Sequence, residues 1–271
     1  HAPSHTRGTA KMSTVGERWG RVFWQGRTWS VHVTEQGLEL YNGNWWQETV
    51  HPTGVVVSAD QVTWLTPTAP RSILCVGRNY RAHAAELGNQ VPDKPLFFLK
   101  PVSAGLGHQG IIRRPTGVGR IDYEGELVVV IGRRLARGAR PAEIKPAILG
   151  ITVGNDVTAR DLQRTDGQWT RAKGFDTFAP VGPWVTLGLD WRGRILETTV
   201  NGTVRQQSST DAMIFDVESL LWEASRFMTL EPGDLLFTGT PEGIGSLDDG
   251  DEVSVTVQGV GTLSNLIKNE E

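Results

Sequence analysis

The run Asp122-Tyr123-Glu124-Gly125-Glu126-Leu127-Val128-Val129-Val130 places two glutamates directly before a series of β-branched residues. Such a series predicts a buried strand and therefore a fold built around a sheet. Residues two apart on a strand point to the same face, so we expect the carboxylates of Glu124 and Glu126 to converge. Two like charges on a partly buried face repel each other unless a cation or a shared proton compensates them. The spacing alone is also compatible with a solvated edge strand, because Glu-x-Glu pairs are common on protein surfaces.

A third carboxylate follows another predicted strand. The residues Ile151-Thr152-Val153 lead into Gly154-Asn155-Asp156. An aspartate at the end of a strand, followed by a polar turn, is placed to project into a cleft. Together with Glu124 and Glu126, and with no cysteine or histidine beside them, Asp156 would form a site made only of oxygen ligands. Such a site suits Mg²⁺, Mn²⁺ or Ca²⁺ and disfavours zinc.

His83 and Glu86 lie three residues apart in a segment that is predicted to be a short helix, residues 80–87. Positions i and i+3 share a face of a helix, so the carboxylate would fix the tautomer of the imidazole and raise its basicity, as a general base requires. An ordinary exposed His–Glu pair has the same spacing, and the spacing alone favours that second interpretation.

Three further polar side chains are candidates for contact with a substrate. Lys173 lies in Arg171-Ala172-Lys173-Gly174-Phe175, which has neither a helical nor an alternating pattern and is predicted to be a loop. Its ammonium group would neutralise an enolate or carboxylate oxygen, or would be one more solvated cation. Arg160 and Gln163 follow Asp156 by four and seven residues and share a face if that segment is helical.

The glycine-rich run Thr238-Gly239-Thr240-Pro241-Glu242-Gly243-Ile244-Gly245 follows a predicted strand. A dinucleotide-binding loop would open a helix, whereas this run leads into another strand, so the sequence argues against a nucleotide site. A turn of this kind can still offer backbone N–H groups and the Thr240 hydroxyl to a substrate carboxylate.

The composition is that of a globular protein, because 38% of the 271 residues are hydrophobic and 21% are charged. The 27 basic and 30 acidic residues leave a formal net charge of −3, with no basic run, so neither nucleic acid nor an anionic membrane is an expected partner. No segment is apolar over the length of a membrane span. The single cysteine, Cys75, cannot form an intrachain disulfide, which fits the cytoplasm as the expected compartment.

Strand-like segments outnumber helical ones and predict a strand-dominated α+β fold. The strand-like segments are residues 21–24, 28–33, 38–41, 73–76, 96–100, 127–131, 147–153, 181–187, 195–200, 234–238 and 252–257. The helical ones are residues 80–87, 141–147 and 215–227. Two prolines in Pro67-Thr68-Ala69-Pro70 predict a boundary between a small N-terminal β domain, residues 12–70, and a larger domain, residues 71–271. Residues 1–11 are polar, and we expect an added or flexible extension there rather than a secretory signal.

In combination, the motifs resemble the fumarylacetoacetate hydrolase family, and in particular its acylpyruvate hydrolases and 2-hydroxyhepta-2,4-diene-1,7-dioate isomerases. The motifs that carry the resemblance are, in chain order, Gly77-Arg78-Asn79-Tyr80-x-x-His83-x-x-Glu86, Phe98-Leu99-Lys100-Pro101-x-Ser103-Ala104, Asp122-Tyr123-Glu124-x-Glu126-Leu127, Gly154-Asn155-Asp156-Val157-Thr158-Ala159-Arg160-Asp161-Leu162-Gln163, Lys173-Gly174-Phe175-Asp176-Thr177-Phe178 and Thr238-Gly239-Thr240-Pro241-x-Gly243. They cover about residues 72–268. One departure is Gly105, where members often carry a bulkier residue, and it concerns local packing more than chemistry.

The resemblance implies a mixed β-sandwich roll with a small N-terminal β domain, usually assembled as a homodimer. It implies that Mg²⁺ or Mn²⁺, with Ca²⁺ as a further option, binds to three acidic ligands, Glu124, Glu126 and Asp156. It implies catalytic roles for His83, Glu86 and Lys173, with the first two on a short helix that can order over bound substrate. The residues implied in substrate binding are Arg78, Tyr80, Arg160, Gln163 and Thr240.

The implied substrate is a small 2-oxo or 2-hydroxy-dienoic acid that reacts through an enolate stabilised by the metal. Hydrolysis of a C–C bond in an acylpyruvate is the first expectation, because a His–Glu pair is most useful for activating water. Isomerisation of 2-hydroxyhepta-2,4-diene-1,7-dioate and decarboxylation of oxaloacetate share the same enolate, and the sequence does not separate the three outcomes. A more remote alternative is a 2-oxo acid binding protein without turnover, against which the intact His83, Glu86 and Lys173 argue.

Overall fold

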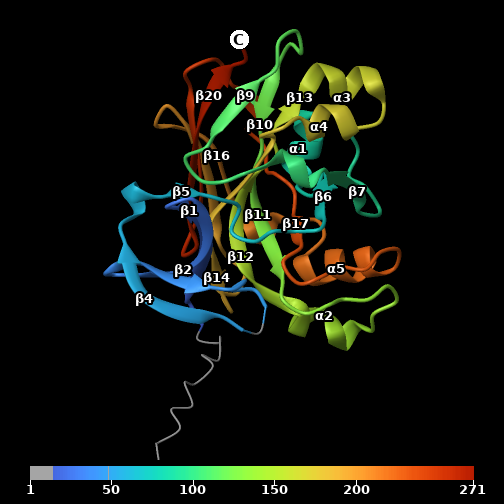
Figure 1. Ribbon diagram of the computed structural model, residues 1–271. Coiled ribbons are helices and arrows are strands. Elements are labelled where there is room, and N and C mark those ends of the chain that lie inside the picture. The colour runs from blue at the N-terminus through green and yellow to red at the C-terminus, as the bar shows by residue number, and fades with distance from the viewer. Residues whose placement is uncertain (1–14, 48) are drawn as a thin grey trace, which may run out of the picture.

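The computed structural model describes residues 15–47 and 49–271, and the extension expected at residues 1–11 lies outside this part of the chain. Strands dominate it, and the helices gather in the right half of the view in Figure 1. The largest sheet of the described residues has 12 strands. Along its main path they are β4 (His51–Val57), β3 (Gly37–Asn42), β2 (Arg27–Thr34), β1 (Arg18–Trp24), β14 (Ala179–Leu187), β12 (Ile148–Asn155), β11 (Gly125–Ile131), β17 (Leu235–Phe237), β6 (Ile73–Gly77) and β7 (Leu96–Lys100). The two short strands off this path are β5 (Thr63–Trp64), which pairs with β1, and β8 (Gly105–Leu106), which pairs with β14.

Two smaller sheets and the helices complete the described fold. The second sheet contains, in order, β16 (Thr203–Ser209), β15 (Ile195–Val200), β19 (Glu252–Val257), β20 (Gly261–Asn269) and β9 (Ile111–Arg114). The third contains β13 (Thr158–Ala159), β10 (Ile121–Tyr123) and β18 (Gly245–Ser246). The α-helices are α1 (Arg81–Glu86), α2 (Pro141–Ala147), α3 (Arg160–Asp166), α4 (Thr170–Gly174) and α5 (Val217–Ser225). Short 3₁₀ turns are formed by Ala59–Gln61, Val102–Ala104 and Thr210–Ala212. Most strand pairs are antiparallel, but three pairs of the described strands are parallel: β17 with β6, β20 with β9, and β14 with β8. The fold is therefore the predicted mixed, strand-dominated α+β type.

Strand β11 lies inside the largest sheet with both faces buried, which explains why its sequence is apolar without interruption after Glu126, from Leu127 to Ile131. Val129 faces a core cluster that reaches Leu196 and Val255 of the second sheet. Val128 faces the opposite cluster, which contains Trp45 of the N-terminal part. Since alternate residues of a strand point to opposite faces, this one strand contributes to two cores. The apolar run therefore carries the acidic residues at its start into the interior of the protein.

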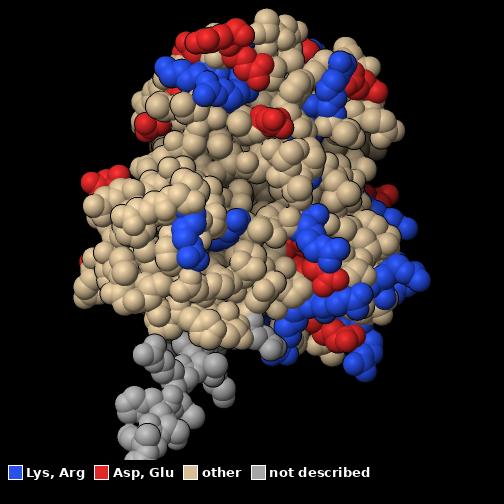
Figure 2. Space-filling model, in the orientation of Figure 1, with Lys and Arg blue, Asp and Glu red and all other residues tan. Residues whose placement is uncertain are grey.

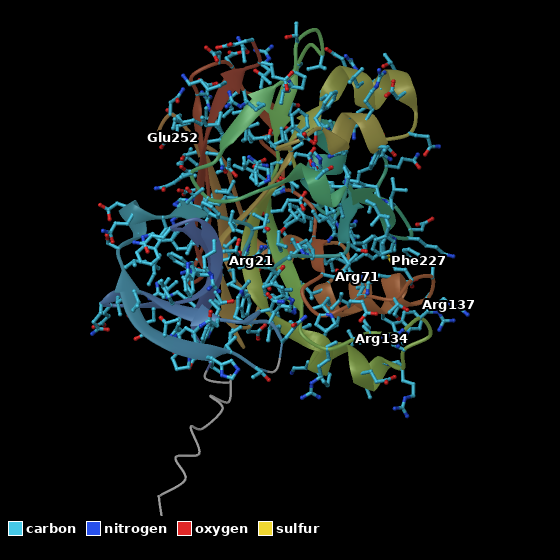
Figure 3. All side chains as sticks on the ribbon, viewed as in Figure 1. Arg21, Arg71, Arg134, Arg137, Phe227 and Glu252 are labelled. Carbon is cyan, nitrogen blue, oxygen red and sulfur yellow. The ribbon has the colours of Figure 1, made fainter. Side chains whose placement is uncertain are left out.

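The N-terminal strands continue the largest sheet. Trp19 of β1 pairs with Val185 of β14, and the first hairpins nevertheless enclose a separate cluster of apolar side chains. Arg21, labelled in Figure 3 between the N-terminal strands and β11, donates hydrogen bonds to the carbonyls of Thr66 and Thr68 at 3.3 and 2.9 Å. These contacts attach the proline-containing segment to β1, and a domain boundary in that segment remains a proposal.

The predicted elements of the larger part are present, and none of their ends is shifted by more than two residues. One prediction was wrong: Lys173 lies in the helix α4 and not in a loop. A helix of five residues is too short to show a 3.6-residue pattern, so its sequence gave no signal. The conditional prediction of a helix that carries Arg160 and Gln163 is confirmed by α3. The strand β20, Gly261–Asn269, was not predicted at all.

Charged side chains of both signs are interspersed on the face shown in Figure 2. Basic side chains gather over the region of α2 and α5, but acidic side chains lie among them. Among the described residues, no helix combines the length and the apolar character that crossing a membrane requires.

Candidate active site

Three carboxylates converge where β11 begins and β12 ends. The two strands are antiparallel neighbours, and their register pairs Gly125 with Asn155. Asp156 follows directly, and its backbone N–H donates to the carbonyl of Glu124 at 2.9 Å. Glu124, Glu126 and Asp156 are all buried, and one carboxylate oxygen from each lies within 4.8 Å of the others. The convergence predicted from the i, i+2 spacing is therefore present, and the solvated edge strand is not.

Cations surround two of these three carboxylates. Glu124 accepts from Arg160 at 2.7 Å and from Lys173 at 3.1 Å. Burial alone would raise the pKa of Glu124, but the charges of Lys173 and Arg160 hold it well below its usual range. Asp156 accepts from Lys173 at 2.8 Å and also from the buried ammonium group of Lys100. Both carboxylates therefore have cationic partners inside the protein.

Glu126 lacks such a partner. Its Oε2 accepts the backbone N–H of Gly239 at 3.0 Å, whereas its buried Oε1 has no hydrogen-bond partner among the described residues. Burial, and then the charges of Asp156 and Glu124, raise the pKa of Glu126 well above its usual value. A buried oxygen without a partner costs about 1–3 kcal/mol, and a bound cation would remove that cost. The all-oxygen donor set and this orphaned oxygen fit a hard divalent cation such as Mg²⁺ or Mn²⁺.

The His83–Glu86 pair lies on α1. The Nδ1 atom of His83 is 3.2 Å from Oε2 of Glu86, and the imidazole is almost completely buried while Glu86 is one-third exposed. The carboxylate also accepts the backbone N–H of Gly243 at 3.1 Å, which ties the helix to the glycine-rich loop. The spacing therefore corresponds to a real contact, and one member is buried, unlike an ordinary surface pair.

A pocket of about 480 Å³ brings most of the predicted residues together. Eight of the eleven contribute to its wall: Arg78, His83, Glu86, Glu124, Arg160, Gln163, Lys173 and Thr240. The other three, Glu126, Asp156 and Tyr80, are buried and are not part of the wall. Inside the pocket, Gln163 accepts a hydrogen bond from Arg160 at 2.7 Å, as expected for residues on one face of α3.

Two of the residues predicted to bind substrate are placed differently from expectation. The Thr240 hydroxyl donates to the carbonyl of Gly125 at 2.8 Å and accepts from Gln206 at 2.9 Å, so its proton is already used within the protein. Tyr80 is buried, and its hydroxyl has no partner among the described residues. Burial, followed by the charges of Glu126 and Glu242, raises the pKa of this phenol.

Three residues of the site were not singled out from the sequence. Lys100 ends the apolar strand β7 and is fully buried against Asp156; a lysine at the end of such a strand was a usable signal. Asp122 opens the acidic run and accepts from Arg160 at 3.0 Å, which its place in that run could have suggested. Trp169 contributes to the wall of the pocket, and the local sequence around it gave no signal.

Comparison with known proteins identifies similar sequences over most of the chain. The model of the family described as fumarylacetoacetate (FAA) hydrolase C-terminal matches residues 72–268. Oxaloacetate tautomerase YisK of Bacillus subtilis is 39% identical over 214 residues, a match that covers 74% of this chain and 71% of the relative.

Two solved structures are similar in fold as well as in sequence. The 2-hydroxyhepta-2,4-diene-1,7-dioate isomerase from Mycobacterium marinum matches with a TM-score of 0.85 at 39% identity, over 94% of this chain and 99% of that one. Fumarylpyruvate hydrolase from Pseudomonas aeruginosa, in complex with Mn²⁺ and pyruvate, matches with a TM-score of 0.70 at 36% identity, over 78% of this chain and 93% of that one.

Proposed function

The chain belongs to the fumarylacetoacetate hydrolase family and is an enzyme of that family, and from this premise we propose that it hydrolyses a C–C bond in a small acylpyruvate-type 2-oxo acid with the help of Mg²⁺ or Mn²⁺. The observation that carries the proposal is that three groups of side chains meet at one pocket. The buried carboxylate triad, the His83–Glu86 pair and the ammonium group of Lys173 all lie at or against its wall.

A divalent cation held by Glu124, Glu126 and Asp156 would supply Lewis-acid polarisation of the 2-oxo acid. Support for this role comes from the orphaned Oε1 of Glu126 and from a related hydrolase whose structure holds Mn²⁺ and pyruvate. Arg160 and Gln163 lie in the same wall, and we propose that they orient the substrate carboxylate. An arginine suits this role because its planar group can contact a carboxylate through two hydrogen bonds.

His83 is the proposed general base. Glu86 fixes its ring from the Nδ1 side, which leaves Nε2 to take a proton from water. The resulting hydroxide adds to the acyl carbonyl carbon. The bond from that carbon to C3 of the pyruvate unit then breaks, and its electron pair passes into the pyruvate enolate. Protonation of C3 gives pyruvate, and the acyl group leaves as a carboxylate.

Lys173 is proposed to stabilise the negative charge that develops on the enolate oxygen. Burial acts to lower its pKa, but the charges of Asp156 and Glu124 overcome this and raise it, so the side chain carries its charge at neutral pH. Its bonds to both acids and to Thr158 at 2.8 Å hold the ammonium group in a fixed position. A fixed buried charge stabilises an oxyanion more effectively than a solvated one.

A second candidate is keto–enol tautomerisation or isomerisation of a 2-oxo acid, because relatives at the same level of identity are described as a tautomerase and as an isomerase. In that reaction His83 would move one proton from one oxygen or carbon atom of the substrate to another, and no water molecule would be added to the substrate. Decarboxylation of oxaloacetate is a third outcome of the same enolate chemistry.

A panel assay separates these reactions. The protein would be supplied with Mg²⁺ or Mn²⁺ and with fumarylpyruvate, acetylpyruvate, 2-hydroxyhepta-2,4-diene-1,7-dioate and oxaloacetate, and products would be identified by NMR. Release of pyruvate from an acylpyruvate supports hydrolysis. Interconversion of enol and keto forms without pyruvate release supports the second candidate and rejects the first.

We further propose that the enzyme acts as a homodimer in a reducing compartment such as the cytoplasm. Leu96 and Leu99 are exposed on β7, which is an edge strand of the largest sheet, and such an edge is suited to cover by a second copy. The buried free thiol of Cys75 is compatible with reducing conditions. Sedimentation equilibrium of wild type and a Leu99→Lys variant tests the dimer.

A further inference from the structure

A series of hydrogen bonds leads from strand β10 to the imidazole of His83. The hydroxyl of Tyr123, the last residue of β10, donates to the carbonyl of Gly243 at 2.7 Å. The N–H of Gly243 donates to the two carboxylate oxygens of Glu86 at 3.1 and 3.3 Å, and Oε2 of Glu86 lies 3.2 Å from Nδ1 of His83. Tyr123 is buried and directly precedes Glu124 of the carboxylate triad. The series therefore connects the strand that leads into the triad with the proposed base.

Gly243 is the flexible point of this series. Its φ angle is 95°, in the region that favours glycine, and a Cβ atom there would lie 2.2 Å from the carbonyl oxygen of Arg205. Glycine restricts the rotation of its two flanking peptide groups less than any other residue does. One of these groups carries the N–H that binds Glu86, and the other carries the carbonyl that binds Tyr123. The phenol thus fixes the peptide group that Glu86 does not contact.

Packing leaves the loop partly unsupported at this point. A hollow of about 570 Å³ lies against it, lined by Tyr123, by residues 243–246 and by side chains of neighbouring segments. Tyr123 pairs with Gly245 between β10 and β18, and a Cβ atom at Gly245 would lie 2.8 Å from the phenol oxygen. The absence of a side chain at Gly245 therefore leaves room for the hydroxyl of Tyr123 to reach the carbonyl of Gly243.

The helix α1 depends on outside contacts of this kind for its position. It has six residues, and no side chain caps its N-terminus. A helix this short is not stable by itself, so tertiary contacts determine where His83 and Glu86 lie. The bond from Gly243 to Glu86 is one of these contacts, and the orientation of the loop sets its direction.

We propose that Tyr123 is a positioning residue for the proposed base: its hydroxyl holds the glycine-rich loop so that the N–H of Gly243 faces Glu86, and Glu86 in turn holds His83. With the carboxylate as its acceptor, Nδ1 of His83 carries the proton and Nε2 stays free to accept one. The inference rests on the proposed function for the role of His83. Tyr123 is not part of the pocket wall, so it acts through the loop and not on the substrate.

The tautomer of His83 tests the proposal without any turnover. Nitrogen NMR spectra of protein labelled at histidine, recorded with Mg²⁺ at a pH where the imidazole is neutral, distinguish a protonated from an unprotonated ring nitrogen. Wild type should show one tautomer with the proton on Nδ1, and the spectrum of His83→Gln identifies the signals. Tyr123→Phe removes only the hydroxyl. Its two nitrogen shifts should move towards each other, because both tautomers become populated.

Turnover of a substrate that the panel identifies gives a second measurement. The kcat of Tyr123→Phe should fall roughly threefold to tenfold with little change in KM, because the hydroxyl orients the base and does not bind substrate. Tyr123→Phe should add no further loss to Glu86→Gln, because the hydroxyl acts through that carboxylate. Tyr41→Phe is the matched control: Tyr41 is a partly buried tyrosine that packs on Trp19 at 4.9 Å, outside the pocket, and the variant should match wild type in both measurements.

Three results would overturn the proposal. The first is a mixture of His83 tautomers in wild type, and the second is a wild-type tautomer in Tyr123→Phe. The third is an equal loss of kcat from Tyr123→Phe in the presence and in the absence of the Glu86 carboxylate. A changed tautomer in Tyr123→Phe together with a panel that shows no turnover would reject the proposed reaction alone and support the positioning role.

Discussion

Gln206 of β16 accepts the backbone N–H of Gly125 at 3.0 Å through its side-chain oxygen, and this bond crosses from the second sheet to the centre of the carboxylate triad. The side-chain nitrogen of Gln206 donates to the hydroxyl of Thr240 at 2.9 Å, and that hydroxyl donates to the carbonyl of Gly125. Both backbone groups of Gly125 are therefore bound. A Cβ atom at Gly125 would lie 2.1 Å from Thr198 Oγ1, so only glycine fits. The arrangement fixes the spacing between Glu124 and Glu126.

Replacement of Gln206 by leucine should weaken metal binding. Gln206→Leu leaves the buried N–H of Gly125 without a partner and frees the segment between the two glutamates. An unsatisfied buried donor costs about 1–3 kcal/mol, so we expect the Kd for Mn²⁺ to rise roughly tenfold or more. Calorimetric titration with Mn²⁺ measures it. The neighbouring Gln207 is exposed and bonds to Glu197 at 2.9 Å, so Gln207→Leu is the matched control and should bind as wild type. Equal affinities of the two variants for Mn²⁺ would contradict the role of Gln206 in positioning the two glutamates.

Loss of the imidazole at position 83 should abolish most of the turnover and spare metal binding. General acid–base catalysis contributes roughly 10²–10⁴-fold, so kcat of His83→Gln should fall by about that factor. The His32–Glu39 pair offers a matched control, because its Nδ1 atom also lies 3.2 Å from a glutamate Oε2 while it sits on the N-terminal hairpin. His32→Gln should keep wild-type kcat. Steady-state assays on the active substrate of the panel provide the comparison, and unchanged turnover of His83→Gln would remove the base assignment.

The features that the sequence predicts well are local ones. The convergence of Glu124 and Glu126 follows from the period of a strand, and the contact between His83 and Glu86 follows from the period of a helix. Both depend on residues within a few positions of each other. For the same reason, the burial of residues 127–131 of β11 could be expected from their uninterrupted apolar run.

The features that the sequence does not predict depend on contacts between distant segments. Lys100 binds Asp156 across 56 positions, and only the packing of β7 near the triad creates that pair. The pairing of Trp19 with Val185 continues the sheet into the N-terminal part, and no local pattern specifies which strand accepts β1. The Thr240 hydroxyl is another example, because Gln206, 34 positions away, determines that its proton is used inside the protein.

Replacement of Glu126 by glutamine should stabilise the metal-free protein and eliminate metal binding. Glu126 is repelled by Glu124 and Asp156, and its folded pKa is raised above its ordinary value of 4.5 by burial and by those charges. The folded protein therefore binds a proton more tightly than the unfolded chain does, and stability falls as the pH rises above the unfolded pKa. Glu126→Gln removes this loss of stability. The variant should therefore exceed wild type in its free energy of unfolding by an amount that grows from pH 4.5 towards neutrality.

Thermal unfolding in the presence of a chelator, at several pH values, measures this advantage. Glu143→Gln is the control, since Glu143 is exposed and lies outside the pocket. Addition of Mn²⁺ should raise the Tm of wild type and of the control, and it should leave the Tm of Glu126→Gln unchanged. If Glu126→Gln is less stable than wild type in the presence of the chelator, the three carboxylates do not destabilise the metal-free protein by repelling one another.

The thiol of Cys75 should report metal binding through its protection. Cys75 is fully buried on β6, and burial, followed by the charge of Asp156, raises its pKa well above the ordinary value, so the folded protein should react very slowly with a thiol reagent. Labelling then requires opening of the sheet. At a metal concentration of about 100 Kd, binding stabilises the folded state by roughly 2.7 kcal/mol, so the labelling rate should fall by about a hundredfold. In denaturant the rate should be fast and independent of metal. The Glu126→Gln variant should label at one rate with and without Mn²⁺, and protection by Mn²⁺ in that variant would place the metal somewhere other than the triad.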